Sequence, residues 1–424
     1  MPVDRRKAGI FAAAVALRLL LFSAFPTLPD LLTSRVEVST PISSFKRLQE
    51  GLFLYTHNVS PYDGGVFYQA PLLLSIFTLL PNPRHYPLAT GLLYTAIDLL
   101  NAKALMTISD SGESVTGRFH SSLRKHIRWD GPAIAAWYLF NPFVLASCLG
   151  RSTTAFTNLA ILQAISSAVT GNTLNTMIAL GFASYLSLYP ILLFPPLMLL
   201  CYDRLTLSKK RAPGQAVFTL ANLGILAVVI AGFLFASYLV TGFSWEFLPA
   251  TYGAHLLVPD LTPNVGLWWY FFIEMFDSFR EFFLGVFWLH LAGYVGGLTV
   301  RLRRQPLFVI TTLVGIFAIY KPYPSIVDVS LYFALLPLYR HLAPLTRYTF
   351  FAAAAILYST LLGPAFYHLW IYYGSGNANF FYAITLVWSL GLTILIADHI
   401  FAALRDEWEQ ENPKMMGKDV RQIS

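Results

Sequence analysis

Three long stretches of this chain carry almost no charge, and they restrict its fold class more than any motif does. Residues 131–202 contain only Arg151, and residues 212–245 and 348–397 contain no Lys, Arg, Asp or Glu. A membrane-spanning helix needs about 20 consecutive apolar residues. Charged residues make up 12% of the 424 residues, about half the usual share in a soluble domain. The chain is therefore expected to be an all-α polytopic membrane protein.

The apolar segments predict about eleven to thirteen transmembrane helices, with interfacial amphipathic helices, in a single multispanning domain over residues 1–424. The first span is placed at 8–25, where Arg18 is expected to snorkel or to pair with another helix. Three prolines in the segment 174–201 are expected to divide it into two half-helices or to kink it.

Basic residues gather in short clusters between the apolar segments, which is typical of cytosolic loops. Both termini and the charged tail 404–424 are therefore expected in the cytosol. Three segments are expected on the lumenal side or at its interface: residues 26–68, 242–282 and 365–379. Two full spans between residues 68 and 108 would strand the basic loop 118–128 in the lumen, so one is expected to be re-entrant, unless that loop breaks the rule. The net charge of +7 comes with no aromatic platform for bases, so no nucleic acid is expected as partner.

The segment 26–68 contains a predicted amphipathic helix. Pro41 and the serines at 43 and 44 can start it, and it runs to about Tyr55. Its apolar side chains share one face: Phe45, Leu48, Leu52 and Tyr55. Such a helix is expected to lie on the membrane surface.

The segment 258–283 combines acidic and aromatic residues inside a membrane-apolar context. As one helix from Gly266, it has two stripes. Phe272, Phe276, Phe279 and Phe283 form the first, and Glu274, Asp277 and Glu281 form the second. Asp277 and Arg280 are close enough in sequence to pair. Carboxylates are costly inside a bilayer, so this helix is expected in the interface or against a polar cavity or partner. The alternative is an interfacial helix that only closes the fold.

The segment 365–379 offers turn glycines, the amides of Asn377 and Asn379, and an aromatic belt that includes His368 and Trp370. These groups suit a polyhydroxylated or phosphorylated lipid headgroup; the alternative is a reversal loop whose asparagines cap helices. Lys321 and Asp328 lie near another lumenal helix end, where an ion pair that holds spans together is expected.

Motifs for covalent or metal chemistry are missing from the sequence. There is no Gly-x-Ser-x-Gly, no glycine-rich phosphate loop and no Cys-x-x-Cys or His-x-x-x-His spacing, so no metal is expected. Cys148 and Cys201 lie in apolar segments. The carboxylates of the first lumenal segment include no close pair for acid/base catalysis.

Several blocks of the chain resemble the phosphatidylinositol-glycan class U family, a multispanning subunit of glycosylphosphatidylinositol (GPI) transamidase. The blocks are RVEVSTPISSFKRLQEGLFL (35–54), VSPYDGGVFYQAPL (59–72), NPFVLASC (141–148), SLYP (187–190), VPDLTPNVGLWWYFFIEMFDSF (258–279) and HLWIYYGSGNANFFYAIT (368–385). They cover nearly the whole chain in order, and the last two are long enough to be specific.

The resemblance implies a non-catalytic subunit of an endoplasmic-reticulum membrane complex that attaches GPI to proteins. Other subunits, including a cysteine-protease-like catalytic one, and the GPI glycolipid are the implied partners; the bound lipid is a substrate, and no cofactor is implied. The family is related to lipid-dependent mannosyltransferases of the GT-C fold but lacks their acidic motif. A GT-C-like architecture is therefore expected.

Two sets of site residues are predicted on this basis. Residues expected to bind the GPI lipid are Asn377, Asn379, His368, Trp370, Trp268, Trp269 and Phe272. Residues expected to contact a partner subunit or a phosphoethanolamine are Asp260, Asn264, Glu274, Asp277 and Arg280. An active GT-C mannosyltransferase with Glu37 as its base is the first alternative, and a transporter, suggested by intramembrane charges and broken helices, is the second.

Overall fold

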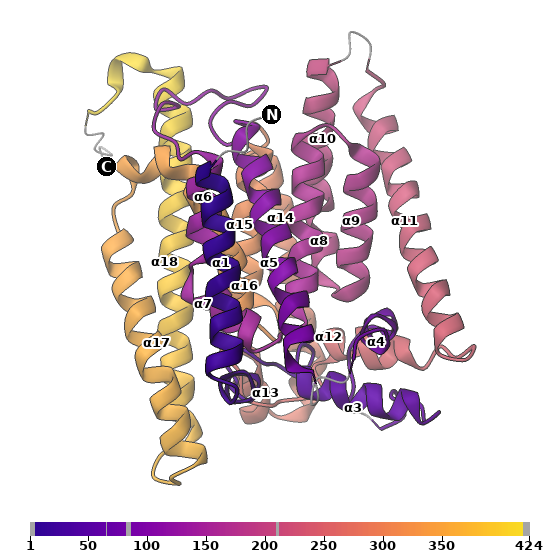
Figure 1. The fold of residues 1–424 in the computed structure, drawn as a ribbon. Helices are drawn as coiled ribbons and strands as arrows, with labels where there is room; N and C mark the ends of the chain where they lie inside the picture. Colours follow the sequence, from indigo (N-terminus) through magenta and orange to yellow (C-terminus); the bar gives the residue numbers. More distant parts are fainter. Residues whose placement is uncertain (1–4, 65, 82–85, 209–211, 419–424) are drawn as a thin grey trace.

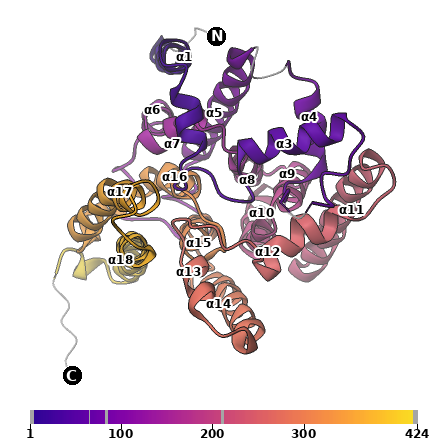
Figure 2. The same ribbon diagram turned by 90° about the horizontal axis from the view of Figure 1, so that it is seen from below.

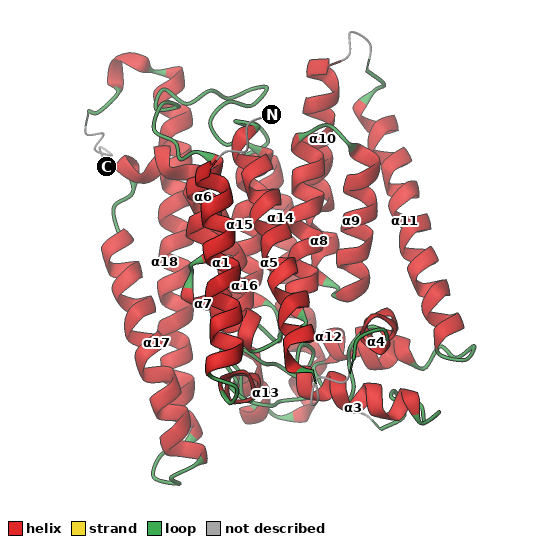
Figure 3. Ribbon diagram, in the orientation of Figure 1, coloured by secondary structure: helices red, strands yellow, loops and turns green. Residues whose placement is uncertain are grey.

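The protein is described here from a computed structural model that covers residues 5–64, 66–81, 86–208 and 212–418. These residues form helices and loops, with a single isolated β-bridge between Thr116 and Ser121 (Figure 3). The described part of the chain therefore has the all-α architecture expected from its composition.

The helices follow one another with short connections. The α-helices are α1 (Arg5–Ala24), α2 (Leu28–Thr33), α3 (Phe45–Thr56), α4 (Pro71–Thr78), α5 (Pro87–Asp110), α6 (Gly131–Leu139), α7 (Pro142–Leu149), α8 (Thr154–Val169), α9 (Thr173–Leu186), α10 (Phe194–Ser208), α11 (Gln215–Val240), α12 (Ala254–Leu257), α13 (Trp268–Glu274), α14 (Arg280–Arg301), α15 (Pro306–Tyr320), α16 (Ile326–Leu335), α17 (Thr349–Ile371) and α18 (Ala378–Glu411). Short 3-10 or π segments are η1 (Tyr189–Leu193), η2 (Pro249–Gly253), η3 (Asp277–Phe279), η4 (Leu336–Leu345) and η5 (Pro413–Met415).

The long helices run roughly parallel to one axis, so the bundle has two ends (Figure 1). The basic end holds the start of α1, the loop 111–130, the turn 302–305 and the last turns of α18. The aromatic end holds residues 25–64 and 66–70, residues 241–279 and the tip of the α17–α18 hairpin, which reaches furthest along the axis. Seen from below, α17 and α18 lie side by side at the margin of the bundle (Figure 2).

Seven helices in the described part are long and apolar enough to cross a membrane, or eight if α6 and α7, bent by 55° at residues 140–141, form one span. The chain is thus a multi-pass membrane protein. The predicted count of eleven to thirteen is higher. It included α8, α9 and α15, which are apolar but have only 10–17 residues, and α5, which carries Asp98 and Lys103.

Of the two segments expected as spans between residues 68 and 108, the first contains only the short helix α4. With 8 residues, this helix is too short to cross a bilayer, and it lies with α3 at the aromatic end (Figure 1). Of the described helices between residues 68 and 110, α5 runs along the bundle, and it brings the basic loop 111–130 to the same end as the start of α1. The start of α1, the basic loop 111–130 and the turn 302–305 therefore share one end of the bundle.

Two further local predictions are confirmed. In α3, Ser44 caps the helix by accepting a hydrogen bond from the backbone N–H of Arg47, and Phe45 and Leu48 are buried. The proline-rich segment 174–201 is divided: α9 ends at Leu186, and η1 and α10 continue in a second helical element from Tyr189.

Buried ion pairs join helices inside the bundle. On α1, Arg18 is fully buried and its Nη2 lies 2.8 Å from Asp98 Oδ2 of α5. The predicted Lys321–Asp328 pair also forms, with 2.5 Å between Nζ and Oδ1, and the Ser325 backbone N–H donates to the same carboxylate. Both predictions of a pairing role are therefore confirmed.

The segment 258–283 is not one helix from Gly266. Met275 and Phe276 have extended backbones, with ψ of 150° and 136°, so α13 ends at Glu274 and a new helical element begins at Asp277. The predicted Phe stripe is broken as a result: Phe272 is buried, whereas Phe276 and Phe279 are exposed. The predicted Asp277–Arg280 pair is replaced by hydrogen bonds from Arg280 to two backbone carbonyls, those of residues 257 and 258.

Candidate functional site: an apolar cavity at the aromatic end

A cavity of about 300 Å³ lies between the loop 32–38, α7 and the α17–α18 hairpin. Its walls are mainly apolar, with Phe143, Ile384 and Trp388 among them, and the hydroxyls come from Ser359, Thr360 and Thr385. Ligand sites for small molecules usually start at about this volume. The cavity is therefore large enough for part of a lipid.

An ion pair provides the charge of this cavity. Arg35 and Glu37 both line it, and Arg35 donates to the Glu37 carboxylate from Nε at 3.1 Å and from Nη2 at 2.9 Å. The Glu37 carbonyl accepts a hydrogen bond from the backbone N–H of Ile326, which fixes this loop to the start of α16. The Arg35 guanidinium also lies over the Tyr367 ring, with 5.9 Å to its centroid. Both charges are thus held in place beside the apolar space.

A cluster of aromatic side chains adjoins the cavity at its lining residue Phe381. Trp269 of α13, Trp370 of α17 and Phe381 of α18 have ring centroids 6.1–6.4 Å apart. Tyr382 extends the cluster and donates to the Leu267 carbonyl at 3.1 Å. Trp269 is buried, and its indole N–H has no acceptor among the described residues. Two predicted lipid-binding residues, Trp269 and Trp370, therefore meet beside the cavity.

The predicted headgroup residues of the 365–379 segment lie at the hairpin tip. Asn377 caps α18 by accepting from the Phe380 N–H at 3.3 Å, and Asn379 accepts a hydrogen bond from the Tyr270 hydroxyl. Both asparagines and His368 are exposed. Asn377 thus caps a helix, as expected if this segment is a reversal loop, and Asn379 links the hairpin to α13.

Trp268 and Phe272 point away from the cavity. They pack in a separate cluster with α14 and Tyr323, and the Trp268 indole N–H donates to the Tyr320 carbonyl at 2.9 Å. Trp268 and Trp269 are consecutive in α13, so their side chains leave the helix about 100° apart. This places the two indoles in different clusters.

The residues predicted to contact a partner or phosphoethanolamine are scattered. Asp260 pairs with Arg47 at 2.7 Å. Burial raises the pKa of Asp260, but its hydrogen bonds with Thr262 and the Arg47 guanidinium lower it more, and the net shift is downward. Asn264 is buried and accepts from the Gly266 N–H. The remaining acidic members, Glu274 and Asp277, are exposed at the aromatic end, and Arg280 is half-buried.

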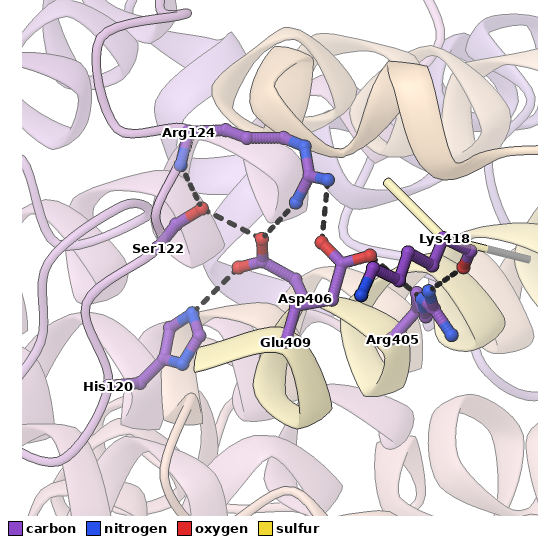
Figure 4. Close-up of polar contacts among 7 residues, drawn as sticks. All are labelled: His120, Ser122, Arg124, Arg405, Asp406, Glu409 and Lys418. Atoms are coloured by element: carbon purple, nitrogen blue, oxygen red, sulfur yellow. Dashed lines mark hydrogen bonds and ion pairs between the residues drawn. The ribbon is translucent and has the colours of Figure 1, made fainter. Parts of the chain in front are cut away.

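A second polar cluster lies at the basic end, and sequence reasoning missed it (Figure 4). Arg124 bridges two carboxylates of α18, with 3.3 Å to Asp406 Oδ1 and 2.6 Å to Glu409 Oε2. Ser122 donates to Asp406, and His120 Nε2 lies 3.1 Å from it. Asp406 and Glu409 are almost fully buried. The acidic residues at the end of α18 were the available signal, but they had been assigned to a charged tail. We call this group the basic-end clamp.

The family-model match and the sequence relatives agree on one family. The family model described as "GPI transamidase subunit PIG-U" matches residues 12–388. The chain belongs to this family. It is 36% identical over 416 residues to the human GPI-anchor transamidase component PIGU, covering 94% of each chain. It is 35% identical over 423 residues to the GPI transamidase component GAB1 of Saccharomyces cerevisiae, covering 99% of this chain and 100% of that one.

One solved structure is distantly similar to this PIG-U family member. It is ArnT from Cupriavidus metallidurans bound to undecaprenyl phosphate, with a TM-score of 0.44, 14% identity and coverage of 98% of this chain and 82% of ArnT. The GT-C-like architecture stays a prediction from the sequence. The PIG-U match, over residues 12–388, includes every residue that lines the cavity, from Leu32 to Trp388.

Proposed function

We propose that this PIG-U family member is a non-catalytic subunit of GPI transamidase in the endoplasmic-reticulum membrane, and that it holds the GPI lipid beside a separate catalytic subunit. The family match and the relatives named as transamidase components support the complex. The cavity supports the lipid-holding role, because its chemistry consists of apolar walls, three hydroxyls and one ion pair. None of these groups is an activated nucleophile.

The orientation follows from charge. The basic end is the cytosolic side under the positive-inside rule, so both termini are cytosolic and the aromatic end is lumenal. The lipid would place an acyl chain in the cavity and its headgroup beside Trp269, Trp370 and the hairpin tip. Aromatic side chains are favoured at this depth because they present an apolar ring and a polar edge. The exposed Asn377 and Asn379 are then within the headgroup layer.

The observation that carries the proposal is the cavity itself. The test is therefore a substitution that places a large side chain inside it. Thr360 lines the cavity from α17, and the neighbouring Leu361 is exposed on the same helix without lining it. Thr360→Trp is expected to lower GPI-anchored protein at the cell surface about tenfold, the effect of losing about 1.4 kcal/mol of lipid binding. The measurement is flow cytometry of cells that lack the native subunit and express the variant.

Leu361→Trp is the matched control, because it adds the same side chain to the lipid-facing surface. It should leave surface display near that of the unmodified chain. Co-purification of the other subunits shows that the complex assembles with either variant. Full display with Thr360→Trp in an assembled complex would contradict the proposal.

A further inference from the structure

The charged residues that line the cavity are Arg35 and Glu37, which form an ion pair. Apart from the ion pair, the groups that line the cavity are apolar or uncharged. An apolar space bordered by one guanidinium fits an amphiphile whose anionic group directly adjoins its acyl chains. This step rests on the proposed function and specifies the lipid class that the site takes.

We propose that Arg35 binds the phosphate of an anionic phospholipid whose acyl chain occupies the cavity. The fork of Arg35 is only partly used: Nε and Nη2 donate to Glu37, and Nη1 has no acceptor among the described residues. A guanidinium can hold a carboxylate on one edge and a phosphate oxygen on another, with charge-assisted hydrogen bonds to both. Arg35 is half-buried, with 22% of its side chain exposed, so the free edge is accessible while water is partly excluded.

The arrangement around Arg35 keeps that free edge in a fixed direction. The guanidinium of Arg35 lies over the ring of Tyr367 from α17, with 5.9 Å to its centroid. The backbone on both sides is anchored, since Val36 is buried beside Trp269 and the Glu37 carbonyl bonds to the Ile326 N–H. A pre-positioned side chain loses little conformational entropy when a ligand binds. Arg35 is thus prepared for a phosphate before the lipid arrives.

Glu37 has a definite electrostatic effect in this site. It orients Arg35 in the empty cavity, but its negative charge opposes a second anion on the same guanidinium. Glu37→Gln keeps an oxygen that accepts a hydrogen bond from Arg35 and removes the opposing charge. We therefore expect this variant to bind an anionic lipid more tightly, which is the opposite of the loss expected for a catalytic base.

The experiment measures lipid retention by the intact complex in mild detergent. The probes are phosphatidylinositol and a diacylglycerol with the same acyl chains, which lacks the phosphate, and bound lipid is quantified by native mass spectrometry. Arg35→Gln is expected to lower phosphatidylinositol retention about tenfold through loss of a charged hydrogen bond, with diacylglycerol unchanged. Glu37→Gln is expected to raise phosphatidylinositol retention about threefold.

Arg47→Gln is the matched control, because Arg47 forms an ion pair with Asp260 at the same end but does not line the cavity. Equal losses of both lipids in Arg35→Gln would overturn the proposal, since they would indicate a structural role. Complete displacement of phosphatidylinositol by excess inorganic phosphate would contradict the claim that a phospholipid occupies this site. Failure of the unmodified chain to retain either probe, with no effect of Thr360→Trp, would instead contradict the proposed function.

Discussion

At the scale of single residues, polar groups inside this protein either find a partner or stay neutral. His255 of α12 shows the second case. It is buried at the aromatic end, and desolvation, with the positive charge of Lys321 as a smaller cause, lowers its pKa to about 3. Because an unfolded His has a pKa of about 6.5, the unfolded chain binds a proton at this position well before the folded one does.

The sign of the pH effect follows directly. The folded-state pKa of His255 is depressed, so its contribution to stability is fully present above about pH 6.5 and is lost as pH falls toward 3. At pH 5 the loss is about 2 kcal/mol. His255→Gln should remove this part of the pH dependence: its melting temperature in detergent should fall less between pH 7 and pH 5 than that of the unmodified chain. Parallel curves for the two proteins would contradict the assignment.

Sequence reasoning succeeded at the residue scale where burial forces pairing. Arg18 was expected to snorkel or to pair with another helix, and it pairs with Asp98; the expected pair of Lys321 with Asp328 also forms. It failed at Asp277 and Arg280, where spacing in a presumed helix suggested a pair. Both residues lie after the break in the chain, in the continuous helical stretch that starts at Asp277, yet Arg280 donates to backbone carbonyls instead. Helical spacing alone therefore does not identify the partner of a charged side chain.

At the scale of elements, α1 packs into the bundle through three buried residues, Ala14, Arg18 and Phe22, and Arg18 is the charged one. Arg18 lies against Asp98 of α5, and the Tyr138 hydroxyl of α6 donates to the same carboxylate at 3.2 Å. Most of the rest of α1 is exposed. This ion pair therefore fixes how α1 docks on α5.

Removal of one partner should cost more than removal of both. Asp98→Ala leaves the Arg18 charge buried without a counter-ion, and we expect it to destabilise the fold by about 3–5 kcal/mol. Arg18→Met combined with Asp98→Leu removes both charges and should recover most of the lost melting temperature. The measurement is a thermal melt followed by size-exclusion chromatography in detergent. A double variant no more stable than Asp98→Ala would show that the pair has another role.

Elements with a local stop or start signal were predictable, and elements ended by tertiary packing were not. Ser44 caps α3, and prolines separate α9 from α10, so both boundaries could be read from sequence. Nothing comparable marks Met275 and Phe276. Their extended backbone lets Phe272 and Phe283 pack in the same cluster from two different helices. The break at these residues therefore depends on contacts that sequence alone does not show.

At the scale of the whole molecule, the basic-end clamp joins distant parts of the chain. Arg124 lies in the loop after α5, and its partners lie near the end of α18, more than 280 residues later. The same end has an exposed pair, Arg304 with Glu411. The buried ion pairs of Arg124 and the exposed pair of Arg304 carry the same kinds of charge but differ in burial. Comparing variants of the two arginines therefore tests the effect of burial.

Loss of the buried pairs should loosen the basic end. Arg124→Ala leaves Asp406 and Glu409 buried with fewer counter-charges, and we expect a loss of about 3–5 kcal/mol. The loop 111–130 should then be cut faster in limited proteolysis of the protein in mild detergent. Arg304→Ala is the control and should leave the cleavage rate unchanged, because exposed ion pairs contribute little. Equal rates for the two variants would contradict the clamp.

The cavity is the part of the site that sequence could not reveal. Of the residues predicted to contact lipid, Trp269 and Trp370 lie beside the cavity, whereas Trp268 and Phe272 pack in a separate cluster. Arg35 was not singled out, although Glu37 was considered as a base. The charged wall comes from a loop near residue 35 and the opposite wall from helices near residues 360 and 385. Only folding shows that these segments face each other.

That separation has a consequence for biogenesis. A ribosome releases the loop 32–38 long before it releases α17 and α18, so a partly made chain has one wall of the cavity and no opposite wall. Under the proposed function, retention of lipid therefore requires that the last two helices are inserted. Bound lipid would then distinguish a subunit that has both walls of the cavity from one that lacks α17 and α18. Cellular quality control could use this difference to recognise unfinished subunits.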